Sequence, residues 1–171
     1  WIFKQIMVNS DNAVEHGFEN GEYKFIGADG TTHSNAIIWQ EIAVEAGKTY
    51  QFAMKARSEG TTGSWLEVYL NKKPIGDVVE DYTEGVDLYI KSFGGDVESC
   101  GIDAFNGSVF DIIKDGCVLP EGSQFDADGK ITFSASDLTA NGTVFLAIKA
   151  GNWDGNFGTG IFVDDVELKE V

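Results

Sequence analysis

The stretch 64–70, SWLEVYL, alternates one Trp, one Glu and one Tyr with aliphatic residues. Side chains at every second position of a β-strand share a face, so Trp65, Glu67 and Tyr69 lie on one face and the aliphatic residues on the other. Two aromatic rings around a carboxylate suit a sugar, because rings stack on its C–H faces and polar groups bind its hydroxyls. The alternative is that a covering loop buries these rings, or that both faces of the strand are core.

The strand that carries this set must belong to a β-rich protein. Twenty-one glycines, only two prolines and frequent β-branched and aromatic residues are typical of an all-β chain. Ten strands at the spacing of the turns imply two packed antiparallel sheets. Between residues 94 and 124 we expect a long loop with one or two short strands. The predicted strands are 2–8, 21–26, 36–44, 49–57, 64–70, 86–92, 108–113, 130–135, 143–150 and 160–169.

Length and charge limit the possible functions. A chain of 171 residues is long enough for a single domain with a sizeable core, and we expect one domain over residues 1–171. The net charge of −16 argues against nucleic acid and anionic membranes as partners, because binding to these polyanions needs Lys and Arg. No stretch is apolar enough for a membrane span, and the first residues do not form a signal peptide, so we expect an excised piece of a larger protein.

The two cysteines, Cys100 and Cys117, have no CxxC motif and no histidine pair near them. Metal binding through sulfur is therefore not expected. Two alternatives remain open, a disulfide that closes an exposed loop and a pair of buried thiols.

Three stretches, in order along the chain, carry a family resemblance. They are NAVEHGFENG at 12–21, WQEIAVEAGKTYQF at 39–52 and GIFVDDVEL at 160–168. Together they resemble the opening, the paired strands and the closing strand of the carbohydrate-binding modules of the family 4, 9, 16 and 22 group. The resemblance implies a galactose-binding-like jelly roll, a β-sandwich of two antiparallel sheets. The segment between residues 94 and 124 has no counterpart in that group.

The same resemblance implies a structural calcium ion. In this group the acid of the Phe-Glu pair and the first Asp of the closing strand meet where the first and last strands run side by side. Those residues are Glu19 and Asp164 here, with the carbonyl of Gly17 as a third ligand and Asp29 as a further candidate. A hard cation takes about six to eight oxygen ligands and separates carboxylates that otherwise repel each other. Alternatively, Asp164 is a strand-end acid that accepts hydrogen bonds from backbone N–H groups.

The resemblance also implies a ligand on the concave sheet, bound by aromatic side chains on its strands and bordering loops. Trp153, in the loop before the closing strand, takes a position at the rim, whereas Trp39 is equally well explained as core. Lys149 joins the set because Phe145, Ala147 and Lys149 alternate with aliphatic residues. The carbohydrate-binding candidates are Trp65, Trp153, Tyr69, Glu67, Asn152, Asp154, Lys149 and Trp39.

Catalysis is the less favoured interpretation. The sequence has no nucleophile elbow, no His-Glu-x-x-His motif and no phosphate-binding glycine loop. A jelly-roll glycosidase needs two carboxylates that face each other across a cleft, and no compact acid-rich strand suggests such a pair. A third possibility is a structural or adhesive β-sandwich whose aromatic residues are buried against a neighbouring domain.

We therefore expect a non-catalytic module that binds a soluble β-linked polysaccharide. Xylan is the preferred ligand because the chain also looks like modules attached to, or inserted in, family 10 xylanases of gut Bacteroidetes. The resemblance implies a monomeric module within a multidomain enzyme that is extracellular, on the cell surface or periplasmic.

Overall fold

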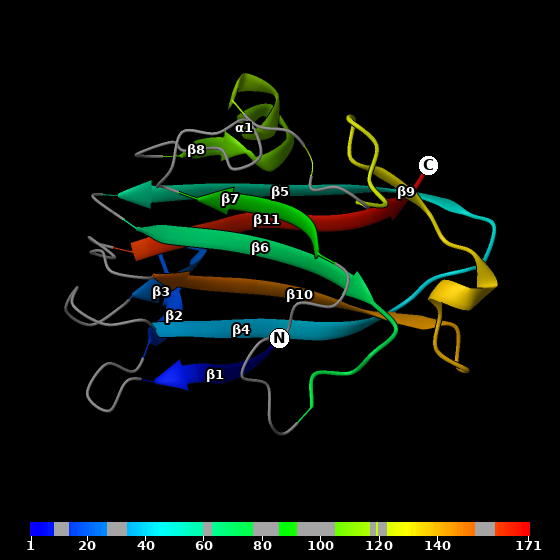
Figure 1. Ribbon diagram of the computed structural model, residues 1–171, viewed down its shortest axis with the longest axis horizontal. Helices are drawn as coiled ribbons and strands as arrows, with labels where there is room; N and C mark the ends of the chain where they lie inside the picture. The colour runs from blue at the N-terminus through cyan, green and yellow to red at the C-terminus, as the bar shows by residue number, and fades with distance from the viewer. Residues whose placement is uncertain are drawn as a thin grey trace.

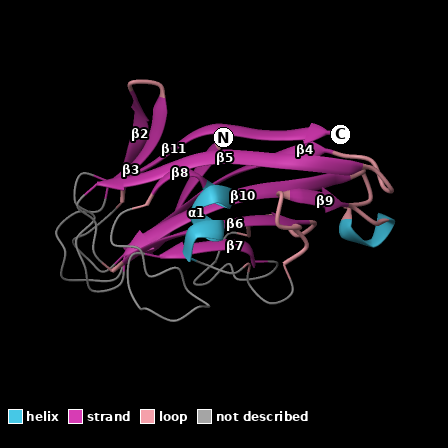
Figure 2. Ribbon diagram, turned by 90° about the horizontal axis from the view of Figure 1, so that it is seen from above, coloured by secondary structure: helices cyan, strands magenta, loops and turns pink. Residues whose placement is uncertain are grey.

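The computed structural model describes residues 1–8, 14–26, 34–59, 63–76, 86–91, 105–116, 119, 123–152 and 160–171. These residues form two antiparallel sheets that face each other as a sandwich (Figures 1 and 2). The predicted all-β sandwich of two antiparallel sheets is confirmed. Within the described part of the chain, no helix is long and apolar enough to cross a membrane.

The first sheet has five strands, and it carries the candidate site. In spatial order they are β1 (Ile2–Val8), β4 (Ser34–Ala43), β10 (Thr143–Asn152), β6 (Ser64–Asn71) and β7 (Val86–Lys91).

The second sheet has six strands. Five follow the order β2 (Glu15–Glu19), β3 (Glu22–Ile26), β11 (Gly160–Glu170), β5 (Thr49–Glu59) and β8 (Asn106–Ser108), and β9 (Lys130–Thr132) also pairs with β5. The β2–β3 hairpin extends beyond the two layers (Figure 2). Its Asn20-Gly21 turn has positive φ at both residues, the conformation for which this dipeptide is favoured in tight hairpins.

The core lies between the sheets and follows the alternation of the sequence. Leu66, Val68 and Leu70 of β6 are at most 5% exposed and meet residues such as Phe52 and Val163 of the other sheet. Strand β10 repeats the pattern, since its even-numbered residues from 144 to 150 belong to the same cluster. The prediction of which side of β6 is core is therefore confirmed, and the other side of this sheet faces outward.

The strand predicted at 108–113 is wrong. This stretch forms the end of β8 and most of α1 (Val109–Gly116). Its apolar residues lie at positions i, i+1, i+3 and i+4, a helical spacing, and all four are buried. They are Val109, Phe110, Ile112 and Ile113.

The predicted neighbourhood of the first and last strands is also wrong. Strand β1 pairs with β4, whereas β11 pairs with β3 and β5 in the other sheet. Strand β2 was missed because its sequence shows no alternation of apolar and polar residues. Four of its five residues are exposed. Cys100 and Cys117 lie outside the described residues.

Candidate functional site

The candidate site is the outer face of the five-stranded sheet, which we define by the residues of β4, β10, β6 and β7 that point away from the core. The strand register aligns them in rows across the sheet. One row contains Asn35, Gly151 and Trp65, the next Ile37, Lys149, Glu67 and Tyr89, the third Trp39, Ala147 and Tyr69, and the last Glu41, Phe145 and Asn71.

A buried ion pair lies in the middle of this face. The Lys149 ammonium is 3.2 Å from a Glu67 carboxylate oxygen, and the two side chains are 3% and 13% exposed. The Tyr69 hydroxyl donates a hydrogen bond to the same carboxylate. Burial, and secondarily the nearby Glu67 charge, raises the pKa of Tyr89 to about 12. This row therefore offers carboxylate, ammonium and phenol groups side by side.

Trp65 lies beside this pair and extends across the neighbouring strand. A Cβ built on Gly151 would stand 2.4 Å from Cζ2 and 2.8 Å from Cε2 of the indole, so the ring occupies the space above that glycine. The residue is 7% exposed. The structure thus brings together Trp65, Glu67 and Lys149, as the alternation in the sequence predicted.

Tyr69 does not form an open stacking platform in this structure. Its side chain is fully buried in a second apolar cluster with Ile37, Ile75 and Ala147. The prediction of two open rings is therefore wrong: Tyr69 is covered within a cluster that includes Ile75 from the segment after β6, and Trp65 is also largely buried. What Tyr69 supplies to the site is its hydroxyl.

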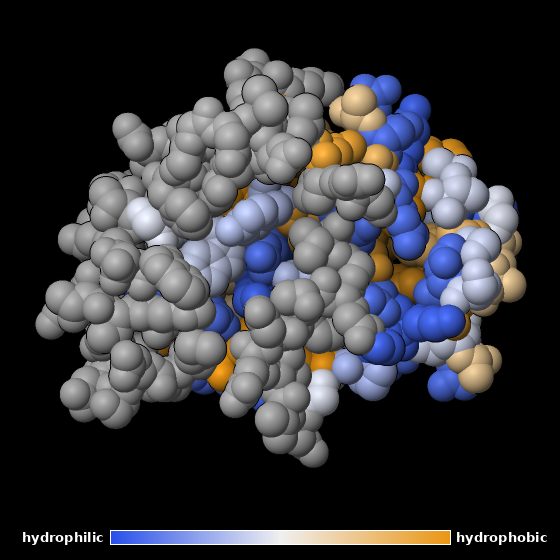
Figure 3. All heavy atoms as spheres, in the orientation of Figure 1, coloured by the Kyte–Doolittle hydropathy of each residue, from blue (hydrophilic) through white to orange (hydrophobic). Residues whose placement is uncertain are grey.

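Trp39 lies on the outer face and not in the core between the sheets. It is half-buried, packs against the second apolar cluster and meets Phe145 edge to face, with ring centroids 5.7 Å apart. Figure 3, viewed from this side, shows hydrophilic and apolar residues intermixed over the described part of the face. An aromatic pair therefore continues the site along β4 and β10.

The prediction that the Asn152 side chain lies on the sugar-binding face is wrong. It is fully buried and pairs with Ser34 and Ser64 in the strand register. By alternation from Lys149, it points toward the interior and not toward the outer face. Trp153 and Asp154 lie outside the described residues.

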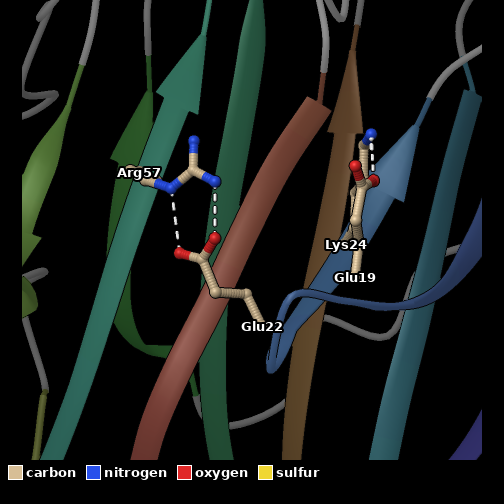
Figure 4. A network of polar contacts seen from close by, with 4 residues as sticks. All are labelled: Glu19, Glu22, Lys24 and Arg57. Atoms are coloured by element: carbon tan, nitrogen blue, oxygen red, sulfur yellow. Dashed lines mark hydrogen bonds and ion pairs between the residues drawn. The ribbon is translucent and has the colours of Figure 1, made fainter.

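The predicted calcium ligands do not converge among the described residues. Strand β3 lies between the Glu19 strand β2 and the Asp164 strand β11, and the Glu19 carboxylate accepts a hydrogen bond from Lys24 at 2.6 Å (Figure 4). Gly17 is on β2 with Glu19. No group of three or more His, Cys, Asp or Glu side chains that could hold a metal occurs in the described part. Since Asp29 lies outside that part, calcium binding stays a prediction.

Tyr89 and Gly151 are two residues of the outer face that sequence reasoning missed. Tyr89 follows from the alternation in β7, where aliphatic residues alternate with Asp87, Tyr89 and Lys91. Gly151 had no local signal, because its role depends on which residues the register places on either side.

The comparisons with known proteins concern the fold. No family model matches the sequence, and a search of curated proteins finds no match. Among solved structures, the chain is similar to one described as "CBM4 structure and function", with 16% identity, a TM-score of 0.45, and coverage of 94% of this chain and 78% of the other. It is also similar to the crystal structure of a non-crystalline cellulose specific carbohydrate-binding module, CBM28, with 13% identity, a TM-score of 0.32, and coverage of 92% and 82%. Because one fold hosts many functions, these likenesses assign no ligand to this chain.

Proposed function

We propose that this chain is a non-catalytic module that binds a neutral, β-linked polysaccharide on the outer face of the five-stranded sheet. The observation that carries the proposal is the position of the Trp65 indole directly beside the buried Glu67–Lys149 pair. A ring supplies a surface for the C–H face of a sugar, and the charged pair supplies an acceptor and a donor for its hydroxyls.

The charge of the whole chain supports a neutral ligand. With a net charge of −16, the protein repels polyanions such as uronate-rich or sulfated chains at long range. A neutral glycan meets no such barrier, and its affinity should depend little on ionic strength.

The spacing of the carboxylates supports binding without catalysis. On strands β4, β10 and β6 of the outer face, the acids are Glu67 and Glu41, which stand two strands and four residues apart in the register. With about 4.8 Å between strands and about 3.3 Å per residue, their Cα atoms are about 16 Å apart. Glycosidases place their two carboxyl groups about 5 to 9.5 Å apart, a separation that this pair would approach only if both side chains extended toward each other.

Xylan is the first candidate ligand. The corresponding biological setting is a larger extracellular, cell-surface or periplasmic protein in which this module lies beside a glycoside hydrolase. Both follow from the sequence resemblance given above. A monomeric module and a structural calcium ion belong to the same proposal.

The test is titration calorimetry against soluble xylan, mixed-linkage glucan, mannan and cello-oligosaccharides. We expect saturable binding to at least one of them, strongest for xylan, and a loss of about 1 to 3 kcal/mol in Trp65→Ala, the range known for bases stacked on aromatic rings. The matched control is Phe18→Ala, since Phe18 is 73% exposed on β2 of the other sheet and should not affect affinity.

Two results would contradict the proposal. Absence of binding to the whole panel, together with unretarded migration in polysaccharide-containing gels, would favour a structural or adhesive β-sandwich. Release of new reducing ends from any of the polysaccharides would show catalysis.

A further inference from the structure

Gly151 is a glycine whose backbone does not require one. Its φ lies outside the left-handed region, so an ordinary L-residue fits the main chain, and glycine within a strand is less stable than Ala. The limited space above Gly151 explains why a glycine occupies this position. A Cβ at this position would stand 2.4 Å from the Trp65 ring and 2.7 Å from the Cβ of Asn35, distances that real Cβ atoms do not reach.

The two sides of this space differ in freedom to move. The Cβ of Asn35 is attached directly to β4, whose carbonyl at this residue accepts a hydrogen bond from the Gln5 side chain at 2.7 Å. The side-chain amide oxygen of Gln5 in turn accepts a hydrogen bond from the Val14 N–H at 2.8 Å. The Cβ of Asn35 is therefore fixed to its strand, whereas the Trp65 ring is joined to β6 through two rotatable side-chain bonds.

We propose that Gly151 is a positioning residue for polysaccharide binding, because the absence of a Cβ there lets the Trp65 indole lie across β10 beside the Glu67–Lys149 pair. This inference rests on the proposed function. Any side chain at position 151 rotates the indole away from the sheet, and the stacking surface beside the Glu67–Lys149 pair is lost.

The test compares Gly151→Ala with Trp65→Ala and the double variant by calorimetry against soluble xylan. We expect Gly151→Ala to bind about tenfold more weakly, as Trp65→Ala does. The double variant should bind no more weakly than Trp65→Ala, because Gly151 is proposed to affect the sugar only through that ring, and the clash with Asn35 lies away from it. The control is Gly76→Ala, where a Cβ meets nothing within 4 Å and φ is not positive. Unchanged affinity in folded Gly151→Ala, or fully additive losses in the double variant, would overturn the proposal.

A second readout separates this proposal from the proposed function. The Trp65 contribution to the near-ultraviolet circular dichroism, defined by the difference from Trp65→Ala, should disappear in Gly151→Ala whether or not any glycan binds. If the wild type binds no polysaccharide, the proposed function fails, and an unchanged spectrum would still refute the positioning of the indole. If Gly151→Ala does not fold, Asn35→Gly with Gly151→Ala removes the second clash. The same spectral change is then expected relative to Asn35→Gly alone, and its absence would refute the inference.

Discussion

The buried ion pair on the outer face predicts a large asymmetry between single and double substitutions. Lys149→Met removes the ammonium and leaves the Glu67 carboxylate in a site where it is 13% exposed, with the Tyr69 hydroxyl as a remaining donor. Removing one partner of a buried pair costs about 3–5 kcal/mol, because the other charge stays buried without compensation. Since the Tyr69 hydroxyl and the residual exposure of Glu67 soften that penalty, we expect the low end, about 3 kcal/mol. In a chain of this size this corresponds to a fall in melting temperature of roughly 6 to 12 °C.

The double variant tests the cause of that loss. Glu67→Gln combined with Lys149→Met leaves no buried charge, and the amide oxygen still accepts from the Tyr69 hydroxyl. We therefore expect the double variant to lose at least about 1 kcal/mol less free energy of unfolding than Lys149→Met alone. A difference of this size is within the range of interaction energies measured for residues in contact. Urea unfolding at pH 7, with equal slopes for all variants, measures the differences.

A second Lys–Glu pair provides the control. Lys48 and Glu170 are 2.7 Å apart, closer than the buried pair, but their side chains are 48% and 49% exposed. Lys48→Met should be far less destabilising than Lys149→Met, because an exposed pair contributes little to stability. If Lys149→Met is no more destabilising than Lys48→Met, or if the double variant is as unstable as Lys149→Met, the reasoning from burial is wrong.

Three further predictions concern pH and metal. Burial raises the pKa of Asp87 to about 6 despite hydrogen bonds from the Leu70 and Gln124 N–H groups. Because the folded state then takes up a proton before the unfolded state does, this group should make the protein more stable as the pH falls from 7 to about 5, by about 1.3 kcal/mol, and Asp87→Asn should remove that dependence in melting curves. Hydrogen bonding to Arg57 lowers the pKa of Glu22, so the stability from this pair should be present above pH 4.5 and lost as the pH falls below it; Arg57→Ala should abolish the acid-dependent part of that loss. If calcium is bound, a chelator should lower the melting temperature and leave polysaccharide affinity nearly unchanged, whereas an unaltered melting temperature would remove the calcium proposal.

The Glu22–Arg57 pair links two strands of the second sheet. Arg57 Nε donates to Glu22 at 2.9 Å, and the guanidinium lies 3.6 Å from the centroid of the Phe162 ring. Figure 4 shows the two side chains meeting across β11, which separates their strands. Lys24 lies 5.1 Å from the same ring and binds Glu19. The acid expected to bind calcium is thus used in an ion pair here.

Period-two alternation was sufficient to predict most of the strands and the side of β6 that forms the core. It failed at 108–113 because a run of four apolar residues in five positions fits a strand buried on both faces and a helix alike. The helical spacing of those residues, i, i+1, i+3 and i+4, was the available signal. Strand β2 had no alternation to read, since four of its five residues are exposed.

The residues of the site were predictable only as far as they share a strand face. Alternation placed Trp65, Glu67 and Lys149 together, but it could not show that Tyr69 is covered, since Ile75 reaches it from the segment after β6. Gly151 needed the register of three strands at once. Long-range packing, which local patterns do not encode, decides both cases.

The outer face combines two properties that are hard to reconcile in a purely structural surface. A solvated face does not bury a lysine side chain to 3% exposure, and a face that serves only as core gains nothing from an ion pair, because apolar residues of similar volume are often as stable. On the proposed function, a neutral polyhydroxyl ligand would use the same pair, since its hydroxyls would donate to the carboxylate and accept from the ammonium. Stability and affinity should therefore separate in the double variant Glu67→Gln, Lys149→Met. It should recover stability relative to Lys149→Met without recovering binding to xylan, and recovery of both together would show that the pair acts only in folding.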